Sequence, residues 1–283
     1  MSAPELSMVV RRPLDPGPLL ASLVAHAVPG VETVSPDGTV RRVVDLDGAR
    51  ALVEARLTSD TVTLGASAGT PAALVDLATR WFGLEDDLAT VDAALARDEV
   101  LAPLLAARPT LRILGHPDGF EAAITTVLGQ QVSLGAARTF GGRLAAAYGT
   151  PGPGGLLVYP SADLLADVDP VELQAVVRIT HARARTLHAV AVACADGLDL
   201  SPSADRADVR ARLLALPGIG PWTADYLALR VLADRDAMPV GDLVLRRALG
   251  IDDARELARV AERWRPWRAY AAVHLWTATA YAV

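Results

Sequence analysis

Apolar residues change their spacing about one third of the way along the chain. Segments 39–46 and 61–67 are rich in β-branched residues and are bounded by Gly, Asp and Ser, which predicts strands. Segment 16–28 has the spacing of a helix. From about Pro103 onward helical patterns follow one another, each ended by Gly or Pro. We therefore expect an α+β fold, with a small antiparallel sheet and packed helices first and an all-α part after it.

This change of pattern predicts a domain boundary near residues 105–115. We divide the chain into an α/β N-terminal domain, residues 1–108, and a helical core, residues 109–283. Within the second domain, segment 148–160 is so rich in Gly and Pro that we expect it to be a connection.

The sequence LPGIGP, residues 216–221, interrupts two helical patterns. Segment 206–216 predicts a helix that ends at the Pro-Gly pair, and Pro221 suits the first position of the next helix. Gly218 and Gly220 allow positive φ and the close approach of another molecule. Free amides at the second helix could then bind a DNA phosphate without reading sequence. A plain tight turn between packed helices is an equal alternative.

Two aromatic residues and one aspartate follow this turn. Trp222 and Tyr226 are four residues apart and share a helix face. Core packing is the ordinary role of such a pair, but beside a bound strand the rings could stack on a displaced base. Asp242 precedes a short helix closed by Gly250, so its ordinary role is an N-cap. An ionised carboxylate there could also oppose positive charge.

Other segments give less specific signals. The apolar positions of segment 120–128 line one helical face, and Gln130 and Gln131 follow. Their amides could cap the helix, or they could form a wedge that enters a base stack. The arginines and histidines of segment 178–188 indicate a solvated helix face or a phosphate contact. Three aromatic residues of segment 264–270 are expected to anchor the last helix.

Composition narrows the chemistry. All 27 basic residues are arginine, so no side-chain amine can form a Schiff base. The single cysteine, Cys194, excludes an internal disulfide and a four-cysteine zinc or iron–sulfur site, and we expect it to be buried. No apolar run approaches the roughly 20 residues of a membrane span, and no leader is recognisable, so we expect a soluble, unexported protein.

The net charge of −6 argues at first against a nucleic-acid partner. However, residues 1–108 contain 9 arginines and 15 acidic residues, whereas residues 109–283 contain 18 of each. The negative surplus lies in the first third, and the neutral remainder can still carry a locally basic face.

Four segments together resemble a known family. They are residues 120–133, 216–230, 239–250 and 262–276. Through them the chain is similar to DNA-3-methyladenine glycosylase II, the alkylation-repair glycosylases of the helix-hairpin-helix superfamily. The resemblance is strong over residues 109–283, and the sequence GVETV at residues 30–34 extends it weakly into the first third.

The resemblance implies roles for individual residues. It implies that Asp242 is the catalytic aspartate, and that Trp222 and Trp276 are walls of a base pocket with Tyr226 beside them. Gln131 matches the position from which the family inserts a side chain into the gap left by a flipped nucleotide. The implied DNA-binding residues of the hairpin are Gly218, Ile219, Gly220 and Thr223. In similar proteins hairpin carbonyls, here those of Leu214, Leu216 and Ile219, hold a monovalent cation, and no cofactor is required.

The implied reaction is hydrolytic excision of 3-methyladenine-type bases from double-stranded DNA, which leaves an abasic site. A cationic base needs no general acid to leave, and aromatic rings attract it by up to ~2 kcal/mol. Asp242 would stabilise the positive charge on the sugar. Relatives that also cut the strand place a lysine where this chain has Trp222, so we expect no lyase activity. We further expect a bacterial, cytoplasmic, nucleoid-associated monomer.

Departures from the family pattern concern the pocket. The first helix has Pro16 and Pro18 where aromatic residues usually approach the pocket, Leu243 stands where a tyrosine often follows the aspartate, and Thr277 follows Trp276. A less aromatic pocket predicts weaker discrimination toward cationic purines, or a shift to another lesion.

Two other functions remain open at this point. The chain could be a non-catalytic module that binds distorted or abasic DNA, which only an activity assay separates from a glycosylase. It could also be a helical protein with an unrelated partner, which would show no salt-dependent DNA binding.

Overall fold

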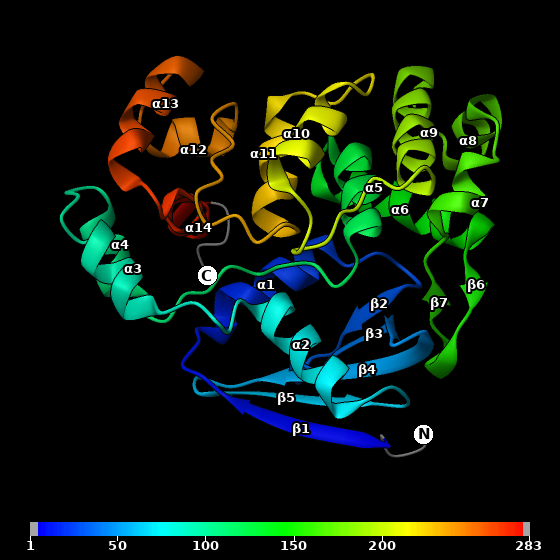
Figure 1. The fold of residues 1–283 in the computed structure, drawn as a ribbon, viewed down its shortest axis with the longest axis horizontal. Helices are drawn as coiled ribbons and strands as arrows, with labels where there is room; N and C mark the ends of the chain where they lie inside the picture. Colours follow the sequence, from blue (N-terminus) through cyan, green and yellow to red (C-terminus); the bar gives the residue numbers. More distant parts are fainter. Residues whose placement is uncertain (1–4, 280–283) are drawn as a thin grey trace.

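The computed structural model describes residues 5–279 and contains a five-stranded antiparallel sheet with the order β1-β5-β4-β3-β2 (Figure 1). The strands are β1 (Leu6–Arg11), β2 (Glu32–Val34), β3 (Val40–Leu46), β4 (Ala49–Leu57) and β5 (Thr61–Ala66). β3 and β5 were predicted almost to the residue. β1, β2 and β4 were missed, although most of β4 alternates between buried and partly exposed positions, as a half-covered strand requires.

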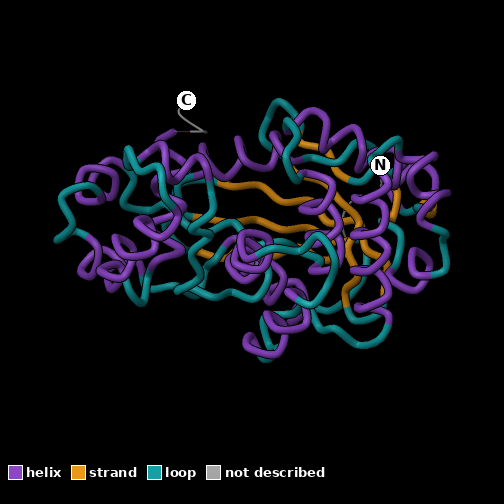
Figure 2. Tube along the Cα trace, turned by 90° about the horizontal axis from the view of Figure 1, so that it is seen from above, coloured by secondary structure: helices purple, strands orange, loops and turns teal. Residues whose placement is uncertain are grey.

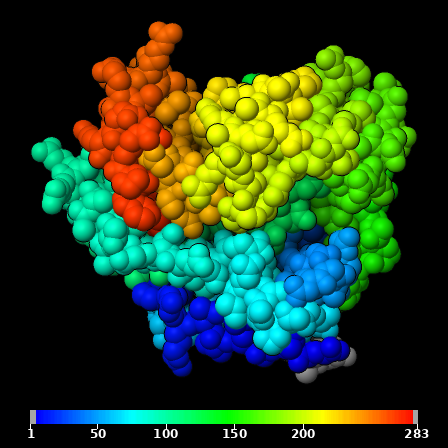
Figure 3. All heavy atoms as spheres, in the orientation of Figure 1, coloured from blue at the N-terminus to red at the C-terminus, as the bar shows by residue number. Residues whose placement is uncertain are grey.

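Two helices, α1 (Pro16–His26) and α2 (Pro71–Phe82), pack beside the sheet (Figure 1). Val53 and Leu64 from the sheet share a buried core with Leu19 of α1 and Trp81 of α2. This core confirms the prediction of a small antiparallel sheet with one or two packed helices. Figure 3 shows this part, blue to cyan, as the lower half of the molecule.

The helices from α5 onward form a layer above the sheet (Figures 1 and 2). They are α5 (Gly119–Gly129), α6 (Leu134–Tyr148), α7 (Ala162–Ala166), α8 (Pro170–Val177), α9 (His181–Ala195), α10 (Arg206–Leu214), α11 (Pro221–Arg230), α12 (Leu243–Ala248), α13 (Ala254–Ala261) and α14 (Arg268–Thr279). The predicted helical core is confirmed, although a short two-stranded sheet lies between α6 and α7. No helix within residues 5–279 is long and apolar enough to cross a membrane.

Helices α3 (Leu88–Leu95) and α4 (Leu101–Ala107) pack with the C-terminal helices. The indole of Trp264 donates a hydrogen bond to Asp98 at 2.8 Å, and the hydroxyl of Tyr270 donates one to Asp86 at 2.6 Å. The expected anchoring role of Trp264 and Tyr270 is thus seen directly. Because α3 and α4 precede residue 108 in the chain but share the C-terminal core, the boundary at that residue stays a prediction.

Segment 148–160 connects α6 to α7, as predicted. It contains a two-stranded sheet, β6 (Thr150–Pro151) and β7 (Leu157–Val158), with the 3₁₀ turn η1 (Pro153–Gly155) between the strands. Leu156 and Val158 pack against Val43 of the large sheet. This tertiary contact stabilises a hairpin that composition alone does not reveal.

A buried ionic cluster joins the sheet to α5. Arg42 of β3 lies 3.2 Å from Glu32 and 2.5 Å from Glu121, and all three side chains are buried. One arginine faces two carboxylates, so the fully ionised cluster would carry a buried negative charge. Burial raises the pKa of Glu121 to about 7, although the charge of Arg42 opposes this shift.

We expect the variant Glu121→Gln to gain stability relative to the natural chain as pH rises from about 4.5 to about 7. At the lower pH the natural chain keeps Glu121 protonated, so the two chains differ little. At the higher pH the natural chain must ionise a buried carboxylate, which the amide avoids, and the difference reaches about 3 kcal/mol at most. Urea unfolding of both chains across this range measures it.

The control is Glu54→Gln, which removes a carboxylate from a more exposed ion pair with Arg41. A stability difference between Glu121→Gln and the natural chain that does not change with pH would contradict the assignment.

Candidate functional site

The α10–α11 hairpin turns at Gly218. This residue has a φ of 77°, and a Cβ built on it would lie 2.1 Å from Oγ1 of Thr186 on α9. Gly220 has an extended φ of −105° and no atom within 4 Å of an added Cβ. Gly218 thus uses the positive φ that glycine allows, whereas Gly220 is extended and leaves the start of α11 uncovered.

The start of α11 presents free backbone donors. Pro221 occupies the first helical position, as predicted, and the N-cap Gly220 has no side chain to bond the following amides. Within residues 5–279 the amides of Gly218, Gly220, Trp222 and Thr223 have no hydrogen-bond acceptor. Such a group of unpaired amides at a helix N-terminus favours an anion.

Asp242 is held by three donors. It caps α12 by accepting a hydrogen bond from the Leu245 amide at 3.0 Å through Oδ1. Trp276 Nε1 donates to the same oxygen at 3.1 Å, and Trp222 Nε1 donates to Oδ2 at 2.9 Å. Asp242 as a whole residue is 9% exposed, so it is nearly buried. Asp242 is therefore an N-cap, and its carboxylate also lies between the two indoles.

The aromatic residues predicted for the base pocket lie together. Trp222 and Tyr226 are stacked with ring centroids 5.2 Å apart, and Trp276 meets Tyr226 edge-on at 6.0 Å. All three rings are partly exposed. Arg230, one further turn along α11, lies with its guanidinium carbon 5.9 Å from the Tyr226 ring centre. Sequence reasoning missed Arg230, although its spacing of four residues from Tyr226 could have found it.

Gln131 and Gln130 lie in the turn after α5 and have different surroundings. Gln131 is exposed and adopts a left-handed φ of 54°. Gln130 is half-buried, and its Nε2 donates to the Gly218 carbonyl and to Thr223 Oγ1, both at 3.1 Å. The hydroxyl oxygen of Thr223, a predicted DNA-binding residue that is buried, accepts the second of these bonds, which leaves its O–H and its main-chain amide as donors.

The residues that depart from the family pattern differ in exposure. Leu243, directly after Asp242, is 48% exposed, whereas Thr277 is buried and so contributes to the core. Pro18 on α1 is buried as well. Of these departures, Leu243 is the one whose side chain is available to another molecule beside the carboxylate.

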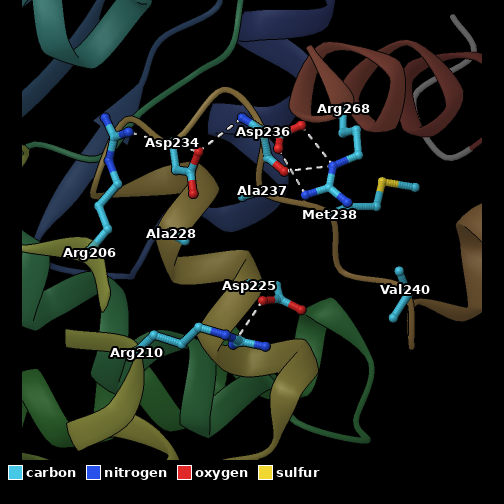
Figure 4. A pocket seen from close by; sticks show the side chains of 10 residues that line it. All are labelled: Arg206, Arg210, Asp225, Ala228, Asp234, Asp236, Ala237, Met238, Val240 and Arg268. Atoms are coloured by element: carbon cyan, nitrogen blue, oxygen red, sulfur yellow. Dashed lines mark hydrogen bonds and ion pairs between the residues drawn. The ribbon is translucent and has the colours of Figure 1, made fainter. Parts of the chain in front are cut away.

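A separate hollow of about 290 Å³ lies on another side of α11 (Figure 4). Asp225 pairs there with Arg210 at 3.0 Å, and Asp236 pairs with Arg268 at 2.8 Å. Burial raises the pKa of Asp225 to about 6. None of the ten lining residues is aromatic and its arginines face aspartates, so this hollow does not have the character of a base pocket.

The remaining chemistry is limited. Cys194 is partly buried, and burial raises the pKa of its thiol to about 12, so it is a poor nucleophile at neutral pH. Within residues 5–279 no group of three His, Cys, Asp or Glu side chains could hold a metal ion. In segment 178–188, the ring of His188 bonds the Ala166 carbonyl and Arg183 bonds the Gln130 carbonyl, so these two side chains are not freely solvated.

Comparisons with known proteins cover both parts of the chain. Residues 5–118 match the AlkA N-terminal domain, and residues 124–267 match the HhH-GPD superfamily base excision DNA repair protein model. The chain is 36% identical to DNA-3-methyladenine glycosylase 2 of Escherichia coli, over 93% of this chain and 94% of that protein.

It is 39% identical to a Mycobacterium tuberculosis protein named "Probable bifunctional transcriptional activator/DNA repair enzyme AlkA", over 98% of this chain but 58% of that protein. The structure of 3-methyladenine DNA-glycosylase from Archaeoglobus fulgidus superposes with a TM-score of 0.83 at 19% identity, covering 96% of this chain and 97% of that one. The chain belongs to the HhH-GPD superfamily of base excision DNA repair proteins, in its AlkA-type branch. The predicted family is confirmed.

We expect Gly218→Ala to destabilise the protein by about 1–3 kcal/mol, because the new methyl group meets Thr186 and a left-handed φ is strained for alanine. Thermal unfolding measures the loss. Gly220→Ala is the matched control: its site is open and extended, and a change below about 1 kcal/mol is expected. Equal effects of the two substitutions would contradict this account of the turn.

Proposed function

We propose that this protein is a DNA N-glycosylase that flips alkylated, 3-methyladenine-type bases out of double-stranded DNA and removes them by hydrolysis. The observation that carries the proposal is the Asp242 carboxylate, oriented by two indole N–H groups in a partly exposed aromatic cluster. The free amides of the hairpin begin the same helix that carries Trp222 and Tyr226. Sequence similarity to a protein named DNA-3-methyladenine glycosylase 2 supports the proposal.

The hairpin would bind one phosphate of the damaged strand. Its free amides and the positive end of α11 suit an anion and read no base. Within residues 5–279 the carbonyls of Leu214 and Ile219 accept no hydrogen bond, whereas that of Leu216 accepts one from the Ile219 amide at 3.3 Å. These neutral oxygens fit the predicted monovalent cation, which would add positive charge near the phosphate.

The proposed reaction breaks the bond between C1′ and the base nitrogen, and the electron pair leaves with the base. An alkylated purine already carries positive charge, so no general acid is needed. The sugar left behind is oxocarbenium-like, and the fixed Asp242 carboxylate stabilises its charge. Water then adds to C1′ and releases a proton to Asp242 or to solvent, which completes the abasic site.

The pocket geometry supports a broad lesion range. One face of the Tyr226 ring stacks on Trp222, and the cation of Arg230 also lies near this ring, which weakens its attraction for a second cation. Leu243 offers an exposed apolar contact where an aromatic ring would bind a cation more strongly. Both features support the expected weaker discrimination toward cationic purines.

We expect Asp242→Asn to slow base release by on the order of 100- to 1000-fold, because the amide keeps the N-cap but removes the negative charge. The measurement is single-turnover release from duplexes containing 3-methyladenine, 7-methylguanine, hypoxanthine or 1-methyladenine, followed by strand cleavage in hot alkali.

Asp169→Asn is the matched control, since Asp169 caps α8 through the Val171 amide at 2.7 Å. Unchanged base release by Asp242→Asn would rule out the assigned role. If the natural chain binds abasic duplex but releases no base from the panel, the protein is instead a module that recognises damaged DNA.

We also expect strand breaks to form only after the alkali step, because the chain has no lysine side chain to open the sugar. Reduction with borohydride during the reaction should trap no covalent complex with DNA. Strand cleavage at neutral pH by the purified protein would contradict a monofunctional mechanism. We further propose that the protein acts as a monomer on the chromosomal DNA of a bacterial cell.

A further inference from the structure

The Gln130 side chain connects two parts of the molecule that lie 88 or more residues apart in the chain. Its Nε2 atom donates to the carbonyl of Gly218, in the hairpin turn, and to Oγ1 of Thr223, in the first turn of α11. Both distances are 3.1 Å. One amide group thus uses both of its N–H bonds to hold the turn after α5 against the hairpin.

Helix α9 also holds Gln130 in place. The guanidinium of Arg183 donates to the main-chain carbonyl of Gln130, and its central carbon lies 5.8 Å from the ring centre of Phe140 on α6. Thr186, one turn further along α9, is the residue against which Gly218 packs. Both the turn after α5 and the α10–α11 hairpin are therefore held in place by contacts with α9.

Gln131 projects from this supported turn. It is exposed, and its left-handed φ of 54° is unusual for a residue other than glycine. α6 begins only three residues later, at Leu134, with Ser133 as its N-cap. A left-handed residue between two capped helices is a conformation that the surroundings must impose, which is typical of functional turns.

We propose that Gln130 is a positioning residue that fixes the distance between Gln131 and the phosphate-binding hairpin. When the hairpin binds a phosphate of the DNA backbone, Gln131 then meets the base stack at a fixed distance from that phosphate. DNA binding and base extrusion are thereby coupled. This inference rests on the proposed function, because it assumes that a base must be extruded.

The test compares paired and unpaired lesions. Gln130→Met keeps the size of the side chain and removes both donors, whereas Gln130→Glu keeps its shape and turns the donor into an acceptor. For both variants we expect the single-turnover rate on a lesion in a matched pair to fall about tenfold. On the same lesion placed in a bulge, where extrusion is already cheap, the rate should fall less than about threefold.

Two further readouts separate positioning from general damage. The Kd for an abasic duplex should change less than about threefold, because the hairpin amides are intact. Thermal unfolding identifies a variant that has lost its fold. If one of Gln130→Met and Gln130→Glu is unfolded, the other one is used to test the positioning role. Gln174→Leu, which removes an exposed contact to His181, is the control and should behave as the natural chain.

An equal loss on paired and bulged lesions, or no loss on paired lesions, would overturn the positioning role. Both results require a natural chain that excises the lesion. If the natural chain excises none, the proposed function itself fails, and the two failures are distinguishable.

Discussion

The site depends on how one carboxylate is held. Asp242 receives a main-chain N–H from α12 and indole N–H groups from α11 and α14, so three helices converge on two oxygen atoms. The indoles and the N-cap together prevent the carboxylate from rotating toward solvent. A charge that is already oriented needs no reorganisation when positive charge develops next to it, which is the condition for electrostatic stabilisation of a transition state.

Sequence patterns predicted those features of the site that depend on residues close together in the chain. The stacked pair Trp222 and Tyr226 followed from a spacing of four residues, and the N-cap at Asp242 followed from its place before a short helix. The contact of Trp276 with Asp242 joins residues 34 positions apart, and only the family resemblance indicated it. Gln130 was missed as a contact because an amide side chain carries no signal of which distant carbonyl it will meet.

The acidic first third has an explanation that composition did not supply. Asp86 pairs with Arg235 at 2.9 Å, and Asp98 pairs with Arg263 at 2.5 Å. Part of the negative surplus thus neutralises arginines of the C-terminal part of the chain, Arg235 in the loop after α11 and Arg263 in the turn before α14. Among the missed strands, β2 has only three residues, so it gains its stability from its neighbours and carries little pattern of its own.

The packing of α3 and α4 against the C-terminal helices has a consequence for synthesis. A ribosome makes the hairpin well before it makes α14, which supplies Trp276. Asp86 and Asp98 are made earlier still, and their hydrogen bonds with Tyr270 and Trp264 can form only after those residues have been made. A nascent chain therefore forms the α10–α11 turn before Trp276 can contact Asp242, and the proposed chemistry at a base requires that α14 has been made.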